Sequence, residues 1–150
     1  MSDLLFRPAT ADDIPAIVAM FADDGRGRGR ETPDDLAPYY EAYERVAADP
    51  NQHLTVAERD GRPVGVLQLS VIPGLSRRGT TRSIVEAVRV HRDARGTGLG
   101  TRLMEWAIEE SRRLGCTLVQ LTSDNARTDA HRFYEKLGFT GSHVGFKLQL

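Results

Sequence analysis

The chain has 150 residues and a mass of 16.6 kDa, the size of one ordinary domain and too small for two of typical size. Its 20 basic and 21 acidic side chains leave a net charge of −1, so no overall field draws it to nucleic acid or to an anionic membrane. With 40% hydrophobic and 27% charged residues, the composition indicates a folded soluble protein rather than a disordered one.

The elements in chain order follow from hydrophobic periodicity and from glycine and proline positions. After a short strand, apolar residues recur at i, i+3, i+4 and i+7 from Ile14 to Phe21, which predicts a helix whose start has capping-box spacing between Thr10 and Asp13. Asp60-Gly61 joins two runs of alternating polarity, which predicts a β-hairpin. Strands are expected at 4–8, 53–59, 63–72, 82–91, 117–122 and twice within 139–150, and helices at about 14–21, 33–48, 99–114 and 127–137.

This order predicts an α+β (mixed α/β) fold. The sheet is expected to be mixed and mostly antiparallel, with six or seven strands flanked by about four helices. Its one strand-helix-strand crossover, between the strands at 82–91 and 117–122, should be parallel. No repeat or linker marks a boundary, so residues 1–150 are expected to form a single domain.

Compartment and metal content are constrained by two further observations. No apolar run approaches the roughly 20 residues of a membrane helix, and the first ten residues lack the pattern of a secretory signal, so a cytoplasmic protein is expected. The lone Cys116 excludes an internal disulfide and a multi-cysteine metal site. The four histidines show no metal-ligand spacing, so no metal is expected.

A glycine-rich turn, Arg95-Gly96-Thr97-Gly98-Leu99-Gly100, carries the strongest chemical signal because it lies between a predicted strand and a predicted helix. Free backbone N–H groups and the helix dipole at such a turn favour a phosphate or pyrophosphate. The spacing fits neither the dinucleotide fingerprint nor a P-loop. On its glycines alone, the segment is equally well a structural tight turn.

This turn and a second segment resemble the GCN5-related N-acetyltransferase (GNAT) superfamily. The second segment consists of Asn125 and then the run from Ala130 to Phe139, AHRFYEKLGF, and the two segments occur in the family's order and spacing. The resemblance implies a single N-acetyltransferase domain that binds acetyl-CoA between two parallel strands splayed apart in the middle of the sheet. It also implies a primary amine acceptor and allows a homodimer, and the near-neutral charge leaves nucleic acid and membrane without a role.

The resemblance also implies where the cosubstrate binds. Val88 and Val90 would offer backbone groups to the pantetheine arm, with the Val88 amide polarising the thioester carbonyl, and Asn125 would be either a cosubstrate contact or a helix N-cap. Arg95 suits phosphate contact, although a solvated loop arginine is the alternative. The pyrophosphate would bind the backbone amides of Arg95, Gly96, Thr97, Gly98, Leu99 and Gly100.

Two residues are expected to be catalytic. By the resemblance, Tyr134 is the general acid; a phenol is a weaker acid than a thiol by about 1.5 pKa units, so its role is mostly a hydrogen bond to the departing thiolate. Glu86 is the candidate base, because a carboxylate is unusual within an apolar strand. It would act through desolvation or through a water relay. The alternative is an outward Glu86 paired with an arginine.

The acceptor is the least determined part of the function. The arginines 77, 78 and 82 would either select an anionic acceptor or lie in a solvated loop. A non-catalytic acyl-CoA-binding sensor is the alternative function. Nucleic-acid binding through the Gly-Arg repeats of residues 25–30 is the weakest reading, since acidic residues flank them.

Overall fold

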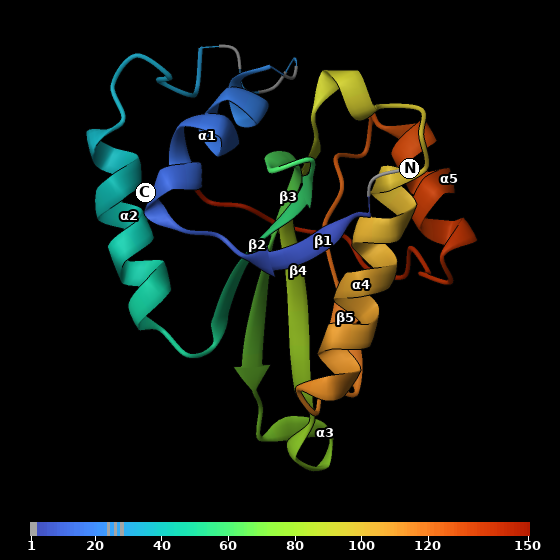
Figure 1. Cartoon of the computed structure of the whole chain (residues 1–150). Coiled ribbons are helices and arrows are strands. Elements are labelled where there is room, and N and C mark those ends of the chain that lie inside the picture. The colour runs from blue at the N-terminus through green and yellow to red at the C-terminus, as the bar shows by residue number, and fades with distance from the viewer. Residues whose placement is uncertain (1–2, 24, 26, 28) are drawn as a thin grey trace. The chain divides into compact units, whose positions relative to one another are not determined.

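The computed structural model describes residues 3–23, 25, 27 and 29–150, and it divides the chain into two compact units, Met1–Gln120 and Leu121–Leu150. The first unit is built around one sheet of five strands in the order β1-β2-β3-β4-β5 (Figure 1). Neighbouring strands are antiparallel except β4 and β5, which are parallel. The strands are β1 (Leu5–Pro8), β2 (Gln52–Arg59), β3 (Arg62–Pro73), β4 (Thr81–Val90) and β5 (Leu118–Gln120).

The helices of the first unit cover both faces of this sheet. Figure 1 shows α1 and α2 on one side of it and α4 on the other. In the second unit, α5 is the helix that the structure describes. The helices are α1 (Ile14–Ala22), α2 (Ala37–Ala48), α3 (Ser76–Gly79), α4 (Leu99–Arg113) and α5 (Thr128–Lys136), with short 3-10 turns at Ala11–Asp13 and Arg92–Ala94.

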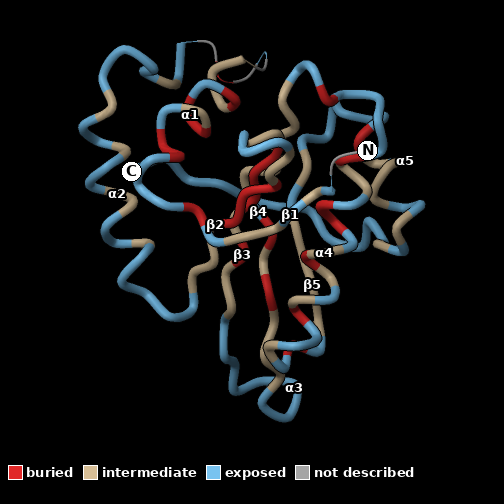
Figure 2. The backbone as a smooth tube through the Cα atoms, in the orientation of Figure 1, coloured by how far each residue is buried: buried red, intermediate tan, exposed pale blue. Residues whose placement is uncertain are grey.

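The core has one layer on each face of the sheet. Ile17 and Val18 of α1 pack with Val56 and Val66 of the sheet, and Leu103 of α4 belongs to the opposite layer, which also contains further fully buried residues of α4. Figure 2 shows the buried residues concentrated on the central strands and on the inner sides of α1 and α4. Helix α2 differs, because none of its residues is buried.

Most of the predicted elements form close to their expected positions. Asp60 and Gly61 both have positive φ, 53° and 74°, which is the geometry of the tight hairpin turn that Asp-Gly predicts. The expected helix at 33–48 begins later, at Ala37, because Asp35 and Pro38 favour a turn before it and a start there. The mixed, mostly antiparallel architecture is confirmed.

The predicted number of strands is too high, because the two strands expected within 139–150 do not form. In the described chain this segment has no strand pairing, and its alternate apolar residues from Val144 to Leu150 lie exposed. Alternation predicts a strand only where a partner strand completes the hydrogen bonding, and here none pairs. Five strands therefore replace the expected six or seven among the described residues. No described helix is long and apolar enough to cross a membrane.

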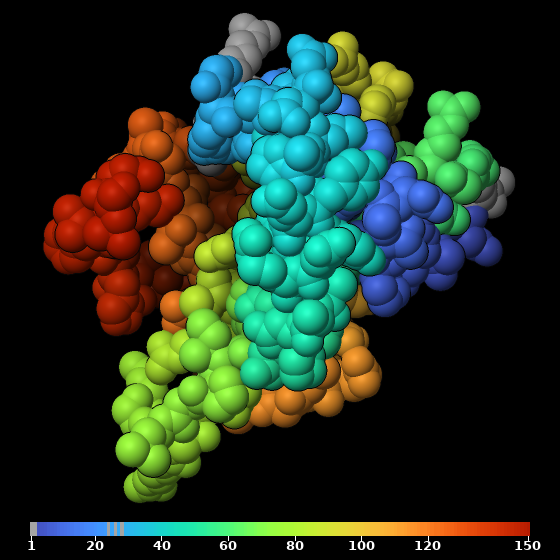
Figure 3. All heavy atoms as spheres, turned by 90° about the vertical axis from the view of Figure 1, so that its left-hand side faces the viewer, coloured from blue at the N-terminus to red at the C-terminus, as the bar shows by residue number. Residues whose placement is uncertain are grey.

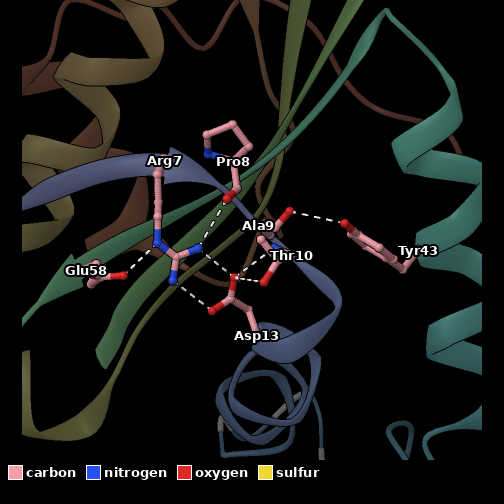
Figure 4. Close-up of polar contacts among 7 residues, drawn as sticks. All are labelled: Arg7, Pro8, Ala9, Thr10, Asp13, Tyr43 and Glu58. Atoms are coloured by element: carbon pink, nitrogen blue, oxygen red, sulfur yellow. Dashed lines mark hydrogen bonds and ion pairs between the residues drawn. The ribbon is translucent and has the colours of Figure 1, made fainter. Parts of the chain in front are cut away.

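A partly buried ion-pair network holds β1 to β2 and to the start of α1 (Figure 4). The Arg7 guanidinium donates to Asp13 through Nη1 and Nη2 at 2.7 and 2.9 Å, and its Nε donates to Glu58 at 2.6 Å. The carboxylate of Asp13 also accepts the backbone N–H of Thr10 at 2.7 Å and is only 6% exposed. The hydrogen bond from Arg7 holds the pKa of Asp13 below its usual range.

Asp13→Ala is expected to lower the free energy of unfolding by about 3 kcal/mol, because it leaves Arg7 without its main partner. Since the pKa of folded Asp13 is depressed, its contribution is complete above about pH 4 and is lost as the pH falls through the folded value. Urea unfolding from pH 3 to 7 should show the difference between wild type and variant shrinking at the acid end. Glu109→Ala, which breaks an exposed pair with Arg112, is the matched control and should cost under about 1 kcal/mol.

Candidate functional site

The second half of β4 carries a β-bulge at the position where the sequence analysis placed the reacting thioester. Gln68 pairs with Glu86 and Val66 pairs with Arg89, so one residue of β3 faces two residues of β4. Ala87 has φ 56°, a left-handed conformation that a residue with a side chain rarely adopts. Bulges of this kind disrupt the ladder locally and are often found beside active sites. The irregularity falls on Ala87 and Val88, so the Val88 amide lies outside the regular pairing.

The parallel pairing of β4 with β5 ends before this bulge. Only three residue pairs join the two strands, from Arg82–Leu118 to Ile84–Gln120. Beyond Ile84, β4 continues for six residues, and in the part of the chain that the structure describes no strand pairs with it on that side. The expected opening of the sheet between these two strands therefore forms.

The glycine-rich turn connects this open strand to α4. Gly96 and Gly98 have φ of 76° and 82°, and a Cβ at either position would meet nothing within 4 Å, so backbone conformation rather than packing requires glycine there. The helix α4 begins at Leu99, and no side chain caps its start. The N–H groups of the first turn remain available to an anion, which is the fit expected for a pyrophosphate.

Arg95 does not lie free in the loop. Its guanidinium donates to the Asp23 carboxylate at 3.2 Å and to the Val90 carbonyl at 3.3 Å, and Arg92 donates to the same carboxylate at 2.5 Å. Asp23 directly follows α1, so it joins the end of that helix to the loop. Sequence reasoning missed this role of Asp23, because no local pattern relates residues more than 60 positions apart. The Arg95 side chain is therefore ion-paired and still half exposed, and its contact with phosphate stays a prediction.

Glu86 is exposed, so of the two routes expected for it as a base, desolvation and a water relay, desolvation does not fit its position. Its cross-strand neighbour is Gln68, and no ion pair to Glu86 occurs among the described residues, so the alternative pairing with an arginine is also absent. Glu86 lies directly before the bulge, which changes the strand's alternation between Glu86 and Val90. Glu86 and Arg89 pair with residues on the α1 face, and the Arg89 guanidinium lies 5.8 Å from the centre of the Phe21 ring.

The second unit contains the other two predicted residues. Tyr134 is half-buried on α5, where its ring packs at 5.2 Å from that of Phe133 and 6.0 Å from that of Phe139. Asn125 is exposed in a turn. The N-cap of α5 is Arg127, so the reading of Asn125 as a helix cap is wrong.

Arg26 and Arg28, on which the nucleic-acid interpretation depends, lie outside the described residues. Within the described ones, no cluster of three or more histidine, cysteine or acidic side chains has the arrangement of a metal site. A cavity of about 490 Å³ lies at the far end of α4 from the glycine-rich turn, against Phe6, Trp106 and Glu110, and none of the predicted site residues lines it.

Comparison with known families adds independent evidence. The model of the acetyltransferase (GNAT) family matches residues 15–139. The chain belongs to this family. The predicted enzyme class, an N-acetyltransferase, is thereby confirmed.

Individual relatives agree with this chain in sequence or in fold. An aminoalkylphosphonate N-acetyltransferase of Salmonella typhimurium is 31% identical over 93% of this chain and 87% of its own length. A crystal structure of a transcriptional regulator from Bacillus halodurans C-125 is 42% identical, covers 99% of this chain and 100% of its own, and has a TM-score of 0.94. An aminoglycoside N-acetyltransferase solved with CoA shares the fold at 14% identity, with a TM-score of 0.80 over 100% of this chain and 96% of its own.

Proposed function

We propose that this chain, as one domain over residues 1–150, transfers the acetyl group of acetyl-CoA to a primary amine by direct attack within a ternary complex. The observation that carries the proposal is the continuous path in the first unit from the open, bulged half of β4 to the glycine-rich turn at the start of α4. No nucleophile is required of the protein, because acetyl-CoA supplies an activated thioester.

Each residue of the site is assigned a role that its chemistry allows. The amides of residues 95–100 bind the pyrophosphate, and Val88 and Val90 offer backbone groups to the pantetheine arm. The Val88 amide, taken out of the regular ladder by the bulge, donates to the oxyanion. Tyr134 donates a hydrogen bond to the departing thiolate, and Asn125 contacts the cosubstrate.

The proton of the attacking amine needs an acceptor. Neutralising an amine of pKa about 10.4 at pH 7 costs roughly 4.6 kcal/mol, so a base or a depressed amine pKa is required. Glu86 fits a relay better than direct contact, because its exposed carboxylate is accessible to water. We therefore assign it the role of holding the water that accepts the proton.

The acceptor amine is a small molecule or a peptide amine. The Salmonella relative acts on an aminoalkylphosphonate, as its name states, which places that class first among the amines to be tested. A panel of aminoalkylphosphonates, amino acids, polyamines, aminoglycosides and peptides, monitored by release of free thiol, tests the function. If acetyl-CoA bound normally but no amine led to release of free thiol, the proposed acetyltransferase activity would be contradicted.

A non-catalytic acyl-CoA sensor is the second candidate. It is favoured by the Bacillus halodurans relative, which is 42% identical to this chain and is named a transcriptional regulator. Calorimetric binding of acetyl-CoA without turnover would support the sensor, whereas thiol release that depends on an added amine would support the enzyme. Absence of binding would contradict both.

Glu86→Gln is expected to lower kcat at pH 7 by about 100-fold, because the variant keeps the shape of the side chain and loses the proton acceptor. The loss should shrink as the pH rises and the amine deprotonates without help. The pH profile of kcat in the thiol-release assay measures both effects. Glu105→Gln, an exposed change on α4, is the control. An unchanged profile in Glu86→Gln would remove this residue from the mechanism.

A further inference from the structure

Opposite charges are segregated along this nearly neutral chain. The 25 residues from Gly61 to Val85 contain four arginines and no acidic residue. The segment from Glu31 to Asp49, which includes α2, contains six acidic residues and one arginine. Both segments belong to the first unit, and each includes one exposed group of like charge: Arg77 and Arg78 in the first, Glu41 and Glu44 in the second.

The basic surface is the tip of the β3–β4 hairpin, residues 72–79. Arg77 and Arg78 are exposed, and within the described chain neither side chain has an ion pair. Both residues adopt the left-handed conformation, with φ of 53° and 61°, and Leu75 beside them is 96% exposed. An exposed leucine beside two unpaired arginines has the composition of a protein-binding anchor, apolar at its centre and charged around it.

The acidic surface is the outer face of α2. This helix buries no residue completely, and its inward side packs through Tyr39 and Tyr43. Its outward side exposes Tyr40, Glu41 and Glu44. The two glutamates are one helical turn apart, so their like charges repel one another. Neither has an ion pair among the described residues.

These two surfaces lie on one side of the first unit. In Figure 3 the exposed side of α2 (cyan) faces the viewer, and the hairpin tip (yellow-green) extends past its lower end. The tip is separated from the glycine-rich turn by the whole length of β4, about 30 Å. A partner bound on this side would leave that turn accessible.

We propose that a second copy of this chain binds here, with the hairpin tip of each copy docked on α2 of the other. Arg77 and Arg78 lie against the partner's Glu41 and Glu44, and Leu75 packs on the partner's Tyr40. Because each copy supplies both halves of the contact, a two-fold axis makes the contact twice. A second copy is favoured over an acidic protein or a polyanion because the complementary charges are both present on this chain, and its acidic face would repel a polyanion.

Charge reversal with mixing tests this interface in the full-length protein. Sedimentation should show the wild type as a dimer that weakens with added salt. Arg77→Glu with Arg78→Glu makes both surfaces acidic, and Glu41→Arg with Glu44→Arg makes both basic. Each double variant alone should dissociate at least about 100-fold more readily, because like charges then face one another. An equimolar mixture of the two variants should form a heterodimer, since both contacts are complementary again.

The control separates the interface from general effects of charge. Arg59→Glu with Arg62→Glu makes the same change in charge at the opposite end of β3 and should leave the dimer intact. Thermal unfolding confirms that each variant is folded. A monomeric wild type, a dimer that survives either reversal, or a mixture that stays monomeric would each overturn the proposal. Binding of the wild type only to an added acidic peptide would identify another occupant and would also overturn it.

Discussion

Gly98→Ala is expected to weaken acetyl-CoA binding at least about tenfold while leaving the protein folded. Gly98 has φ 82°, and a residue with a Cβ loses about 1–2 kcal/mol in that conformation. Relief of the strain would turn the N–H groups of the first turn of α4 away from the pyrophosphate, and about 1.4 kcal/mol of lost binding is a factor of ten in Kd. Calorimetric titration with acetyl-CoA measures the loss.

Gly115→Ala is the matched control. Gly115 follows the other end of α4, has φ 83°, and likewise leaves open space within 4 Å of the point where a Cβ would lie. Both variants should therefore lose a similar amount of thermal stability, but only Gly98→Ala should lose affinity. Equal affinities would show that the turn does not hold the cosubstrate.

Tyr134→Phe is expected to lower kcat about 100-fold with little change in KM. The phenylalanine keeps the ring contacts to Phe133 and Phe139, so the variant removes only the hydroxyl. One hydrogen-bond donor that stabilises charge in the transition state contributes about this much. Steady-state kinetics with the best amine of the panel measures the effect.

The leaving group provides a second readout for Tyr134. An acetyl donor with a more acidic thiol needs less help to depart, so the loss in Tyr134→Phe should shrink with such a donor. Tyr43→Phe removes a hydroxyl that donates to the Ala9 carbonyl at 3.3 Å in the first unit, and it should leave kcat unchanged. If kcat were normal in Tyr134→Phe, the assignment of this residue as the acid would be wrong.

Local patterns in the sequence predicted most of the fold. The helix α4 follows from its apolar spacing, and Gly96 and Gly98 were expected to make the turn before it, as their positive φ values bear out. The parallel pairing of β4 and β5 follows from the crossover between them. The helix and the turn are encoded within a few residues, and the crossover rule needs only the order of the elements, so one sequence is enough to find these features.

Features that depend on distant partners were missed. The pairing of Asp23 with Arg92 and Arg95 joins segments remote in the chain. Two strands were predicted within 139–150, but whether a strand forms depends on a partner that the segment itself does not specify. The bulge at Ala87 and Val88 was missed as well, because neither is a residue type that indicates a bulge.

The bulge in β4 also sets how this chain tolerates changes in length. Deleting Ala87 would restore regular alternation and exchange the two faces for every residue from there to Val90. Arg89 would then turn from α1 toward the layer that contains Leu103, and Val90 would turn away from that layer. We therefore expect β4 to accept many substitutions but no gain or loss of a single residue between Glu86 and the glycine-rich turn. Among homologues, this stretch should keep a constant length even where its residues differ.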